Sequence, residues 1–193
     1  QMCIRDRIGI LNFLPGGAHN VANDKTKHLV RKWVPRVLRA TAPRNSTNMD
    51  WIVFRVAELY LNYAEALNEY YETPPKEAFD AVLKVRERSG MPGFPSTLNK
   101  EQFREKLRRE RAVELAYEDH RFWDIRRWLI ADDEGVMKGA MYGLQLSAVT
   151  GAPGKVHYKP YVFENRLWSD RSYLHPIKQT EIDKGYMLQN PGW

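Results

Sequence analysis

Apolar side chains recur at steps of three and four residues from residue 50 onward, which is the period of an amphipathic helix. The positions concerned are Val53, Val56, Ala57, Tyr60, Ala64, Leu67 and Tyr71. Asp50 is a suitable N-cap for this helix, because its carboxylate can accept hydrogen bonds from free backbone N–H groups. Thr73-Pro74-Pro75 then interrupts the pattern and begins a second helix, since proline is tolerated in a first turn.

The second helix has an apolar stripe of Ala78, Val82 and Val85, with Phe79 beside it. It ends at Ser89-Gly90-Met91-Pro92, where Gly90 can adopt the left-handed conformation and Pro92 prevents the helix from continuing. The two helices form a hairpin of about 34 residues, which is the length of a tetratricopeptide unit. Small residues on both helices allow close approach: Ala64, Ala66, Ala78 and Ala81.

A third helix is predicted after Asn99, which together with Gln102 has the spacing of a capping box. Its inward positions are Phe103, Leu107, Leu115 and Ala116. A break near Asp119-His120 separates it from a shorter helix that runs to about Ile130, and aspartate is among the residues that tolerate left-handed geometry there.

Residues 132–172 lose the helical period and contain several glycines and prolines. Short strands or an irregular hairpin are expected from three clusters of strand-forming residues: 156–159, 161–163 and 166–168. Residues 173–193 are expected to be an extended tail, because Pro176 and Pro191 favour extended conformations before them. The predicted fold is therefore mainly α, with tetratricopeptide-like helical hairpins, irregular loops, a few short strands and an extended C-terminal tail. We expect an irregular leader at 1–49, whose first seven residues we leave unassigned, and one helical domain at 50–193.

Charged residues are concentrated between Glu110 and Trp128. Opposite charges are three or four residues apart, as in Arg111 and Glu114 or Asp124 and Arg127, and such pairs meet on one face of a helix. Apolar residues lie between them, so some of the charges must be buried, and a buried charge requires a partner. We therefore predict a structural salt-bridge lattice between two packed helices. Its members are Glu110, Arg111, Glu114, Arg121, Trp123, Asp124 and Arg127.

The net charge of +6 is unevenly distributed along the chain. Residues 1–44 contribute +7, so the remaining residues sum to −1. A nucleic-acid-binding protein usually concentrates basic residues on a face or groove of its folded core, which argues against nucleic acid as a partner. There is no apolar run of about 18 residues, so we expect no transmembrane helix. We also find no export signal, because Gln1 and Met2 alone precede Cys3.

No set of residues points to catalysis, to a metal or to a cofactor. Every carboxylate of the cluster has an arginine at helical spacing, which lowers its pKa and opposes a role as general acid. The five histidines are scattered and lack the spacing of a zinc site. Motifs for a nucleophile, a P-loop or a dinucleotide are absent from the sequence. We therefore expect no enzymatic activity.

The aromatic residues fall into two groups. One group occupies helical core positions and is expected to pack internally: Tyr60, Tyr63, Phe103, Phe122 and Trp123. The other group lies in or beside loops, where a flat ring can contact the apolar face of a sugar. The candidates for ligand contact are Trp51, Tyr142, Tyr158 and Tyr161, whereas Trp168 is expected to pack.

Three motifs in order carry a resemblance to a known family. The first is the charged segment 110–128, and the second is Tyr173-Leu174-His175-Pro176-Ile177 followed by Glu181-Ile182-Asp183. The third is the closing Gln189-Asn190-Pro191-Gly192-Trp193. Together they resemble the C-terminal portion of a SusD/RagB-family protein over residues 50–193. Lys178 departs from the family pattern, which usually has a second proline there.

The resemblance implies a function as well as a scaffold. SusD-like proteins are outer-membrane, cell-surface lipoproteins that bind oligosaccharides without catalysis and deliver them to a SusC-like, TonB-dependent transporter. The resemblance also implies that the full-length protein is attached to the membrane only through a lipid anchor, which is absent from this chain. Most sugar-contacting residues of the family precede this segment, so the resemblance transfers scaffold residues and no binding residue. A tetratricopeptide-like adaptor for protein segments explains residues 50–130 equally well, but it does not explain the closing tail.

Overall fold

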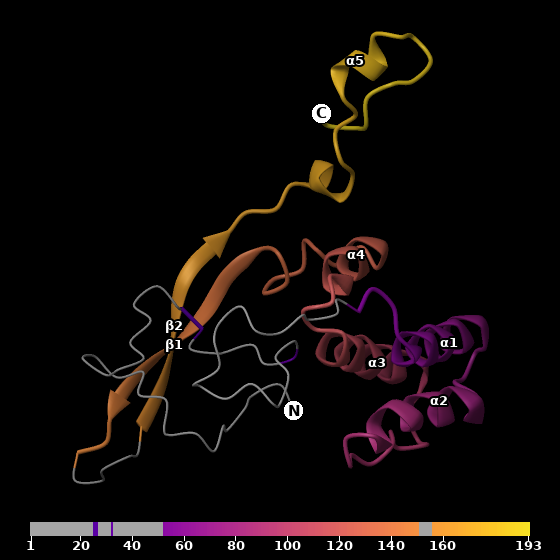
Figure 1. The fold of residues 1–193 in the computed structure, drawn as a ribbon, viewed down its shortest axis with the longest axis vertical. Helices are drawn as coiled ribbons and strands as arrows, with labels where there is room; N and C mark the ends of the chain where they lie inside the picture. Colours follow the sequence, from indigo (N-terminus) through magenta and orange to yellow (C-terminus); the bar gives the residue numbers. More distant parts are fainter. Residues whose placement is uncertain (1–24, 27–31, 33–51, 151–155) are drawn as a thin grey trace, which may run out of the picture. The chain divides into compact units, whose positions relative to one another are not determined.

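The computed structural model describes residues 25–26, 32, 52–150 and 156–193 (Figure 1). Within them the order of elements is α1 (Val56–Tyr70), α2 (Lys76–Glu87), α3 (Lys100–Glu114), α4 (His120–Arg127), β1 (Gly139–Ala148), β2 (Val156–Arg166), the 3-10 helix η1 (Asp170–Tyr173) and α5 (Gln179–Ile182). The predicted class, mainly helical with a small sheet, is confirmed. The chain divides into two compact units between Arg121 and Phe122, and each is described by itself.

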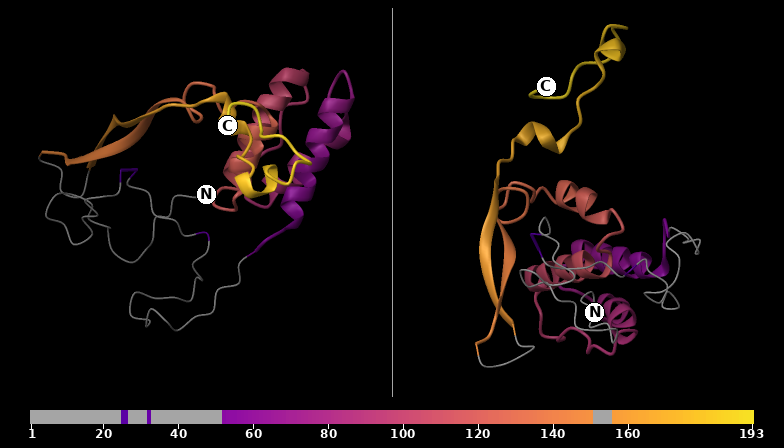
Figure 2. Two further views of the ribbon diagram at one scale, coloured as in Figure 1. Left: turned by 90° about the horizontal axis from the view of Figure 1, so that it is seen from above. Right: turned by 60° about the vertical axis from the view of Figure 1, so that its left-hand side comes forward.

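The first unit is built on α1, α2 and α3. Helix α1 packs against both α2 and α3, as two views of the chain make visible (Figures 1 and 2). The three helices enclose one hydrophobic core, whose buried members are Leu61, Ala64, Ala78, Ala81, Val82, Val85, Phe103, Leu107 and Leu115. Phe103 lies at its centre, with its ring edge-on to Phe79 and to Phe94 at centroid distances of 4.9 and 5.7 Å. Three of the four alanines that the sequence placed at the hairpin contact, Ala64, Ala78 and Ala81, are thus core residues, whereas Ala66 is exposed and lies outside the contact.

Local signals at the helix ends are largely confirmed. The Asn99 side chain accepts from Gln102 N at 2.9 Å, and the Gln102 side chain accepts from Asn99 N at 3.2 Å, which completes the capping box of α3. Gly90 after α2 has φ of 68°, as a left-handed C-terminal residue requires. The expected start of the first helix was wrong. Helix α1 begins at Val56 after Arg55, so Asp50, which is outside the described residues, is not its N-cap.

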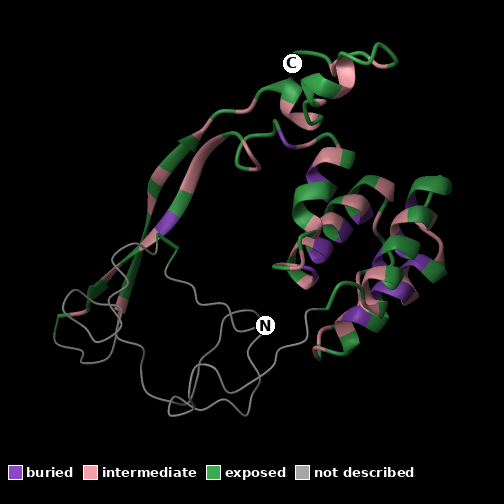
Figure 3. Ribbon diagram, turned by 45° about the horizontal axis from the view of Figure 1, so that its top comes forward, coloured by how far each residue is buried: buried purple, intermediate pink, exposed green. Residues whose placement is uncertain are grey.

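The buried face of α1 differs from the predicted stripe. Leu61, Ala64 and Asn68 are fully buried, and Ala57 and Leu67 pack against the core. Val56, Tyr60 and Tyr71, which belonged to the predicted stripe, are exposed instead, as is Tyr63. Periodicity alone could not separate the two faces, because α1 has apolar residues on both of them. Figure 3 shows buried positions along the inner sides of the three helices.

The second unit contains a long antiparallel hairpin of β1 and β2 (Figure 2). Tyr142 pairs with Val162, Leu144 with Pro160 and Leu146 with Tyr158, after a bulge between Met141 and Tyr142. The first two expected strand clusters, 156–159 and 161–163, belong to one continuous strand, Val156–Arg166. The third cluster, 166–168, begins at the last residue of this strand and continues past its end. Strand β1 was not predicted. Its N–H at Leu144 donates to the carbonyl of Lys25 at 3.0 Å, on the edge away from β2.

The C-terminal tail closes on itself. Gln189 bridges to the backbone of Ile177 through both ends of its amide, at 2.8 and 2.9 Å, and Asn190 donates to the carbonyl of His175 at 2.6 Å. The indole of Trp193 donates to the carbonyls of Arg171 and Leu174 at 2.9 and 3.0 Å. The closing motif is therefore a side-chain clamp. The expected extended tail also contains two short helical turns, η1 and α5.

Candidate functional site

Arg55 is the centre of an ion-pair cluster in the first unit. It donates to Glu114 Oε1 at 2.6 Å and to Glu118 through Nε at 2.7 Å and Nη2 at 2.9 Å. Nη2 also donates to the carbonyl of Glu114 at 2.6 Å. Because Arg55 precedes α1 and both carboxylates lie near the end of α3, this one side chain ties the start of α1 to the end of α3.

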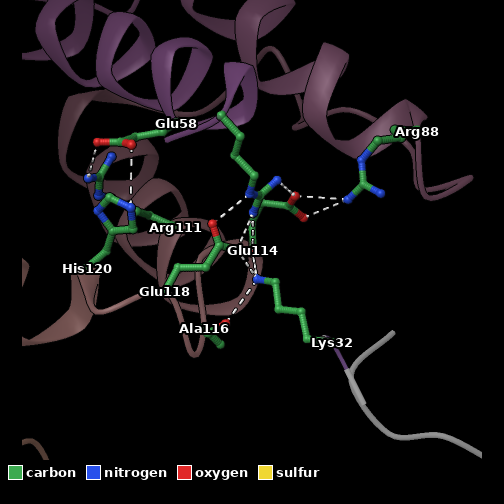
Figure 4. Close-up of polar contacts among 9 residues, drawn as sticks. Lys32, Glu58, Arg88, Arg111, Glu114, Ala116, Glu118 and His120 are labelled. Atoms are coloured by element: carbon green, nitrogen blue, oxygen red, sulfur yellow. Dashed lines mark hydrogen bonds and ion pairs between the residues drawn. The ribbon is translucent and has the colours of Figure 1, made fainter. Parts of the chain in front are cut away.

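Two further cations complete the cluster (Figure 4). Lys32 pairs with Glu118 and donates to the carbonyls of Glu114 and Ala116 at 2.7 and 2.9 Å. These carbonyls lie at the C-terminal end of α3, where cations are favourable. Arg88, just after α2, donates to Glu114 Oε1 at 2.9 Å. The cluster therefore connects segments that are far apart in the sequence.

Burial and pairing act in opposite directions on these groups. Burial would raise the pKa of Glu118, but hydrogen bonds from Arg55 and Lys32 outweigh it and hold the pKa below its ordinary value. For Arg55, burial would lower the pKa, but the hydrogen bonds to Glu118 and Glu114 raise it. The side chains of Glu118 and Arg55 are 4% and 22% exposed. Arg55 and Glu118 are thus a charged and hydrogen-bonded pair at neutral pH, as expected for a scaffold element.

A second group of polar residues lies beside it (Figure 4). Arg111 is buried and donates to Asn62 Oδ1 at 2.5 Å, and its guanidinium is 4.0 Å from Glu58. His120 Nε2 lies 3.4 Å from the other oxygen of Glu58. One residue earlier on α3, Glu110 is buried and pairs with Arg86 of α2. Three of the predicted lattice residues, Glu110, Arg111 and Glu114, therefore contact groups on α1, on α2 or near their ends.

The remaining lattice residues belong to α4. Asp124 is buried and accepts from Arg127 Nε at 2.9 Å, at the three-residue spacing on which the sequence argument placed the pair. Arg121 is exposed. Trp123 is 60% exposed and Phe122 40%, so the expectation that these rings lie in a core was wrong. Helix α4 has eight residues and buries Asp124 and Ile125, which leaves both rings on its outer side.

Two of the four candidate ligand-contact residues lie on one face of the hairpin. Tyr142 and Tyr158 are 66% and 67% exposed, and their cross-strand partners show that they share this face. The other positions on it are also apolar: Leu144, Leu146, Pro160 and Val162. These six residues are called the tyrosine face below. In the sequence, this face corresponds to apolar residues at every second position of both strands. The glycines of β1 made that alternation hard to recognise.

Tyr161 lies on the opposite face of the hairpin, opposite Gly143. It is partly buried, and a side chain at Gly143 would meet the carbonyl oxygen of Lys25 at 2.3 Å and the Tyr161 ring at 3.2 Å. Tyr161 is therefore on the other face of the hairpin from Tyr142 and Tyr158. Trp51 lies outside the described residues. Trp168, expected to pack, is partly buried and has its ring edge-on to Tyr173 at 5.2 Å.

Two other kinds of site are absent from the residues that the structure describes. In residues 25–26, 32, 52–150 and 156–193, no three metal-binding side chains are grouped. No helix in the same ranges combines the length and apolarity needed to span a membrane.

Residues 10–193 match the model of the SusD family. The chain belongs to the SusD family. Among curated SusD-family relatives, the SusD-like protein P25 of Formosa agariphila is 40% identical over 95 residues, which are 48% of this chain and 18% of that protein. The SusD-like protein P2 of the same organism is 30% identical over 158 residues, which are 77% of this chain and 26% of that protein. This SusD-family chain thus spans about a quarter or less of the length of these relatives.

Solved SusD-family structures agree with the fold. A SusD-like protein from Bacteroides fragilis matches with a TM-score of 0.64 at 34% identity, over 75% of this chain and 26% of that one. A SusD homolog from Bacteroides thetaiotaomicron matches with a TM-score of 0.53 at 30% identity, over 77% of this chain and 30% of that one. The family and the helical scaffold predicted from the sequence are therefore confirmed.

Proposed function

We propose that this SusD-family protein binds oligosaccharides without catalysis and presents them to a TonB-dependent transporter at the outer surface of the cell. Family membership supports the class of function. The observation that carries the proposal onto this chain is the tyrosine face, where Tyr142 and Tyr158 are exposed above a continuous apolar surface. Exposed apolar patches mark binding sites, and flat rings suit the apolar faces of sugars.

The geometry of the hairpin supports an extended ligand. Tyr158 is opposite Leu146, which is four residues along β1 from Tyr142. At about 3.3 Å per residue, the two rings are separated by about 13 Å along the strands. A ligand that contacts both must therefore be a chain of several sugar rings, whereas a monosaccharide can contact one of them. In this proposal the ion-pair cluster is scaffold, which fixes the helices and contacts no ligand.

A glycan array followed by calorimetric titration tests the proposal on the 193-residue chain. The double variant Y142A/Y158A is expected to weaken binding at least tenfold, because truncating a central contact costs about 2 kcal/mol and 1.4 kcal/mol is a factor of ten. The control is Y70A, which removes a still more exposed tyrosine (82%) on α1. Binding that both variants leave unchanged would reject the tyrosine face as the site.

The proposed partner requires a separate measurement. Co-purification with a SusC-like transporter that is expressed from the same cells tests delivery, and Y142A/Y158A is expected to keep the transporter while losing the glycan. A protein-segment adaptor, the competing function, predicts the opposite: no glycan on the array and no transporter in the purified complex. The two readouts therefore distinguish the ligand from the partner.

A further inference from the structure

Two buried N–H donors of the second unit have no acceptor among the residues that the structure describes. They are Nε of Arg126, in α4, and Nε1 of Trp168, just after β2. Buried polar groups in folded proteins almost always have a hydrogen-bond partner, so a missing one points to a bound water, ion or ligand. Arg126 uses Nη1 to donate to the carbonyl of Phe122 at 2.9 Å, which leaves Nε free for another acceptor.

The side chains of Arg126 and Trp168 are neighbours. The guanidinium carbon of Arg126 lies 5.3 Å from the centre of the Trp168 ring. It also lies 3.6 Å from the Phe122 ring, which covers one side of the cation. Phe122 in turn stacks on His175, at 6.0 Å and an interplanar angle of 16°. The guanidinium is thus surrounded by aromatic rings, which attract it but supply no hydrogen-bond acceptor in their plane.

Arg126 also differs from its neighbours in how its charge is paired. In the part of the chain that the structure describes, no carboxylate lies within ion-pairing distance of it, whereas its neighbours Arg127 and Arg166 pair with Asp124 and Glu164. Burial lowers the pKa of Arg126, in keeping with a desolvated and unpaired cation. A single water could accept one hydrogen bond from these donors, but it could not neutralise the charge.

We propose that Arg126 and Trp168 form a binding site for an oxyanion carried by a ligand, a carboxylate or a sulfate group. An oxyanion has several acceptor oxygens and one negative charge, so it can accept from both donors and pair with the guanidinium. Arginine is the side chain best suited to such groups, because its N–H donors form a rigid planar fork. The surrounding rings exclude water and strengthen the attraction. Both residues keep partial exposure as whole side chains, and Phe122, which covers the guanidinium, is itself exposed.

The site does not depend on the oligosaccharide function. It stands on an unpaired cation and two orphan donors, whereas the proposed function stands on the tyrosine face. If the anion site and the oligosaccharide function are both correct, the ligand is an acidic glycan whose carboxylate or sulfate group binds at Arg126. The test below therefore uses small anions, whose binding is independent of any glycan.

The experiment follows the indole N–H of Trp168 by NMR in the full 193-residue chain labelled with 15N-tryptophan. Sodium acetate and sodium sulfate are titrated separately against sodium chloride at constant ionic strength, and W168F assigns the resonance. We expect a saturable shift of the Trp168 signal with one or both oxyanions, and the stronger of the two identifies the preferred group. R166Q, which removes a paired arginine of the same unit, is expected to keep the shift, and R126Q is expected to abolish it.

Two results would overturn the proposal. One is a Trp168 signal that neither acetate nor sulfate moves beyond the chloride control, which would leave a water as the partner of the donors. The other is a shift that persists in R126Q. Should R126Q fail to fold, R126K preserves the charge without the guanidinium fork and is expected to weaken binding at least tenfold. Failure of this test leaves glycan binding at the tyrosine face unaffected, so the two proposals are separately testable.

Discussion

Replacing Arg55 with methionine removes the cation that ties the start of α1 to the end of α3. The change keeps most of the side-chain stem and deletes four hydrogen bonds, two to Glu114 and two to Glu118. Arg55 makes no N-cap hydrogen bond with its side chain, so no cap is lost. The variant therefore isolates the effect of leaving two carboxylates without their shared partner.

The expected cost follows from burial. Breaking a buried ion pair by removing one partner costs about 3–5 kcal/mol. The side chains of Glu118 and Glu114 are 4% and 12% exposed, but Lys32 and Arg88 still pair with them. We therefore expect a loss below that range, about 2–3 kcal/mol of unfolding free energy. For a chain of this size, about 2–4 °C per kcal/mol gives a fall of roughly 5–10 °C in Tm.

Urea denaturation followed by far-UV circular dichroism measures this loss, because α1, α2 and α3 supply most of the helix signal. The matched control is R104M, whose partners Glu69 and Glu101 are 43% and 72% exposed, so that about 1 kcal/mol or less is expected. A double-mutant cycle with E118Q should show that the two changes are not additive. R55M as stable as R104M would refute the claim that the cluster holds the helices together.

Three further outcomes are expected. Arg111→Ala should cost about 3 kcal/mol, because it removes the cation beside the Glu58 carboxylate, whose side chain is 12% exposed; a melting curve like that of the unmodified chain would show that these charges are solvated. Asn99→Ala should cost about 1 kcal/mol by breaking the capping box of α3, whereas Asn99→Asp should restore most of it in thermal melts. The lowered pKa of Glu118 adds stability above the ordinary carboxylate pKa of about 4.3, which is lost as pH falls through the lower folded value. The stability gap between the unmodified chain and E118Q should therefore shrink from pH 7 to about pH 3, and a constant gap would contradict the pairing.

Local features of the fold were predictable, because their partners are close in sequence. The capping box of α3 and the left-handed Gly90 follow from residues within one helical turn. The Asp124–Arg127 pair has the same local origin. Arg55, in contrast, is 59 residues from Glu114, and no spacing rule connects them. Sequence analysis therefore placed Glu114 in the lattice and missed the arginine that joins it to Glu118.

Strand β1 was missed for a different reason. Gly143 suggested a loop, whereas the structure places it inside β1, at the point where the carbonyl of Lys25 leaves no space for a side chain. A close approach by a distant segment cannot be read from the local sequence. Similarly, α1 has apolar residues on both faces, and periodicity could not show that Leu61 is buried while Tyr60 is exposed.

A crystal structure of the chain with an oligosaccharide selected from the glycan array tests the central claim most directly. The account predicts a sugar ring stacked on Tyr142 or Tyr158, in van der Waals contact at about 3.5–4.0 Å. It also predicts that the chain of sugars follows the hairpin from one tyrosine toward the other. An oligosaccharide bound elsewhere, with the tyrosine face bare, would contradict it.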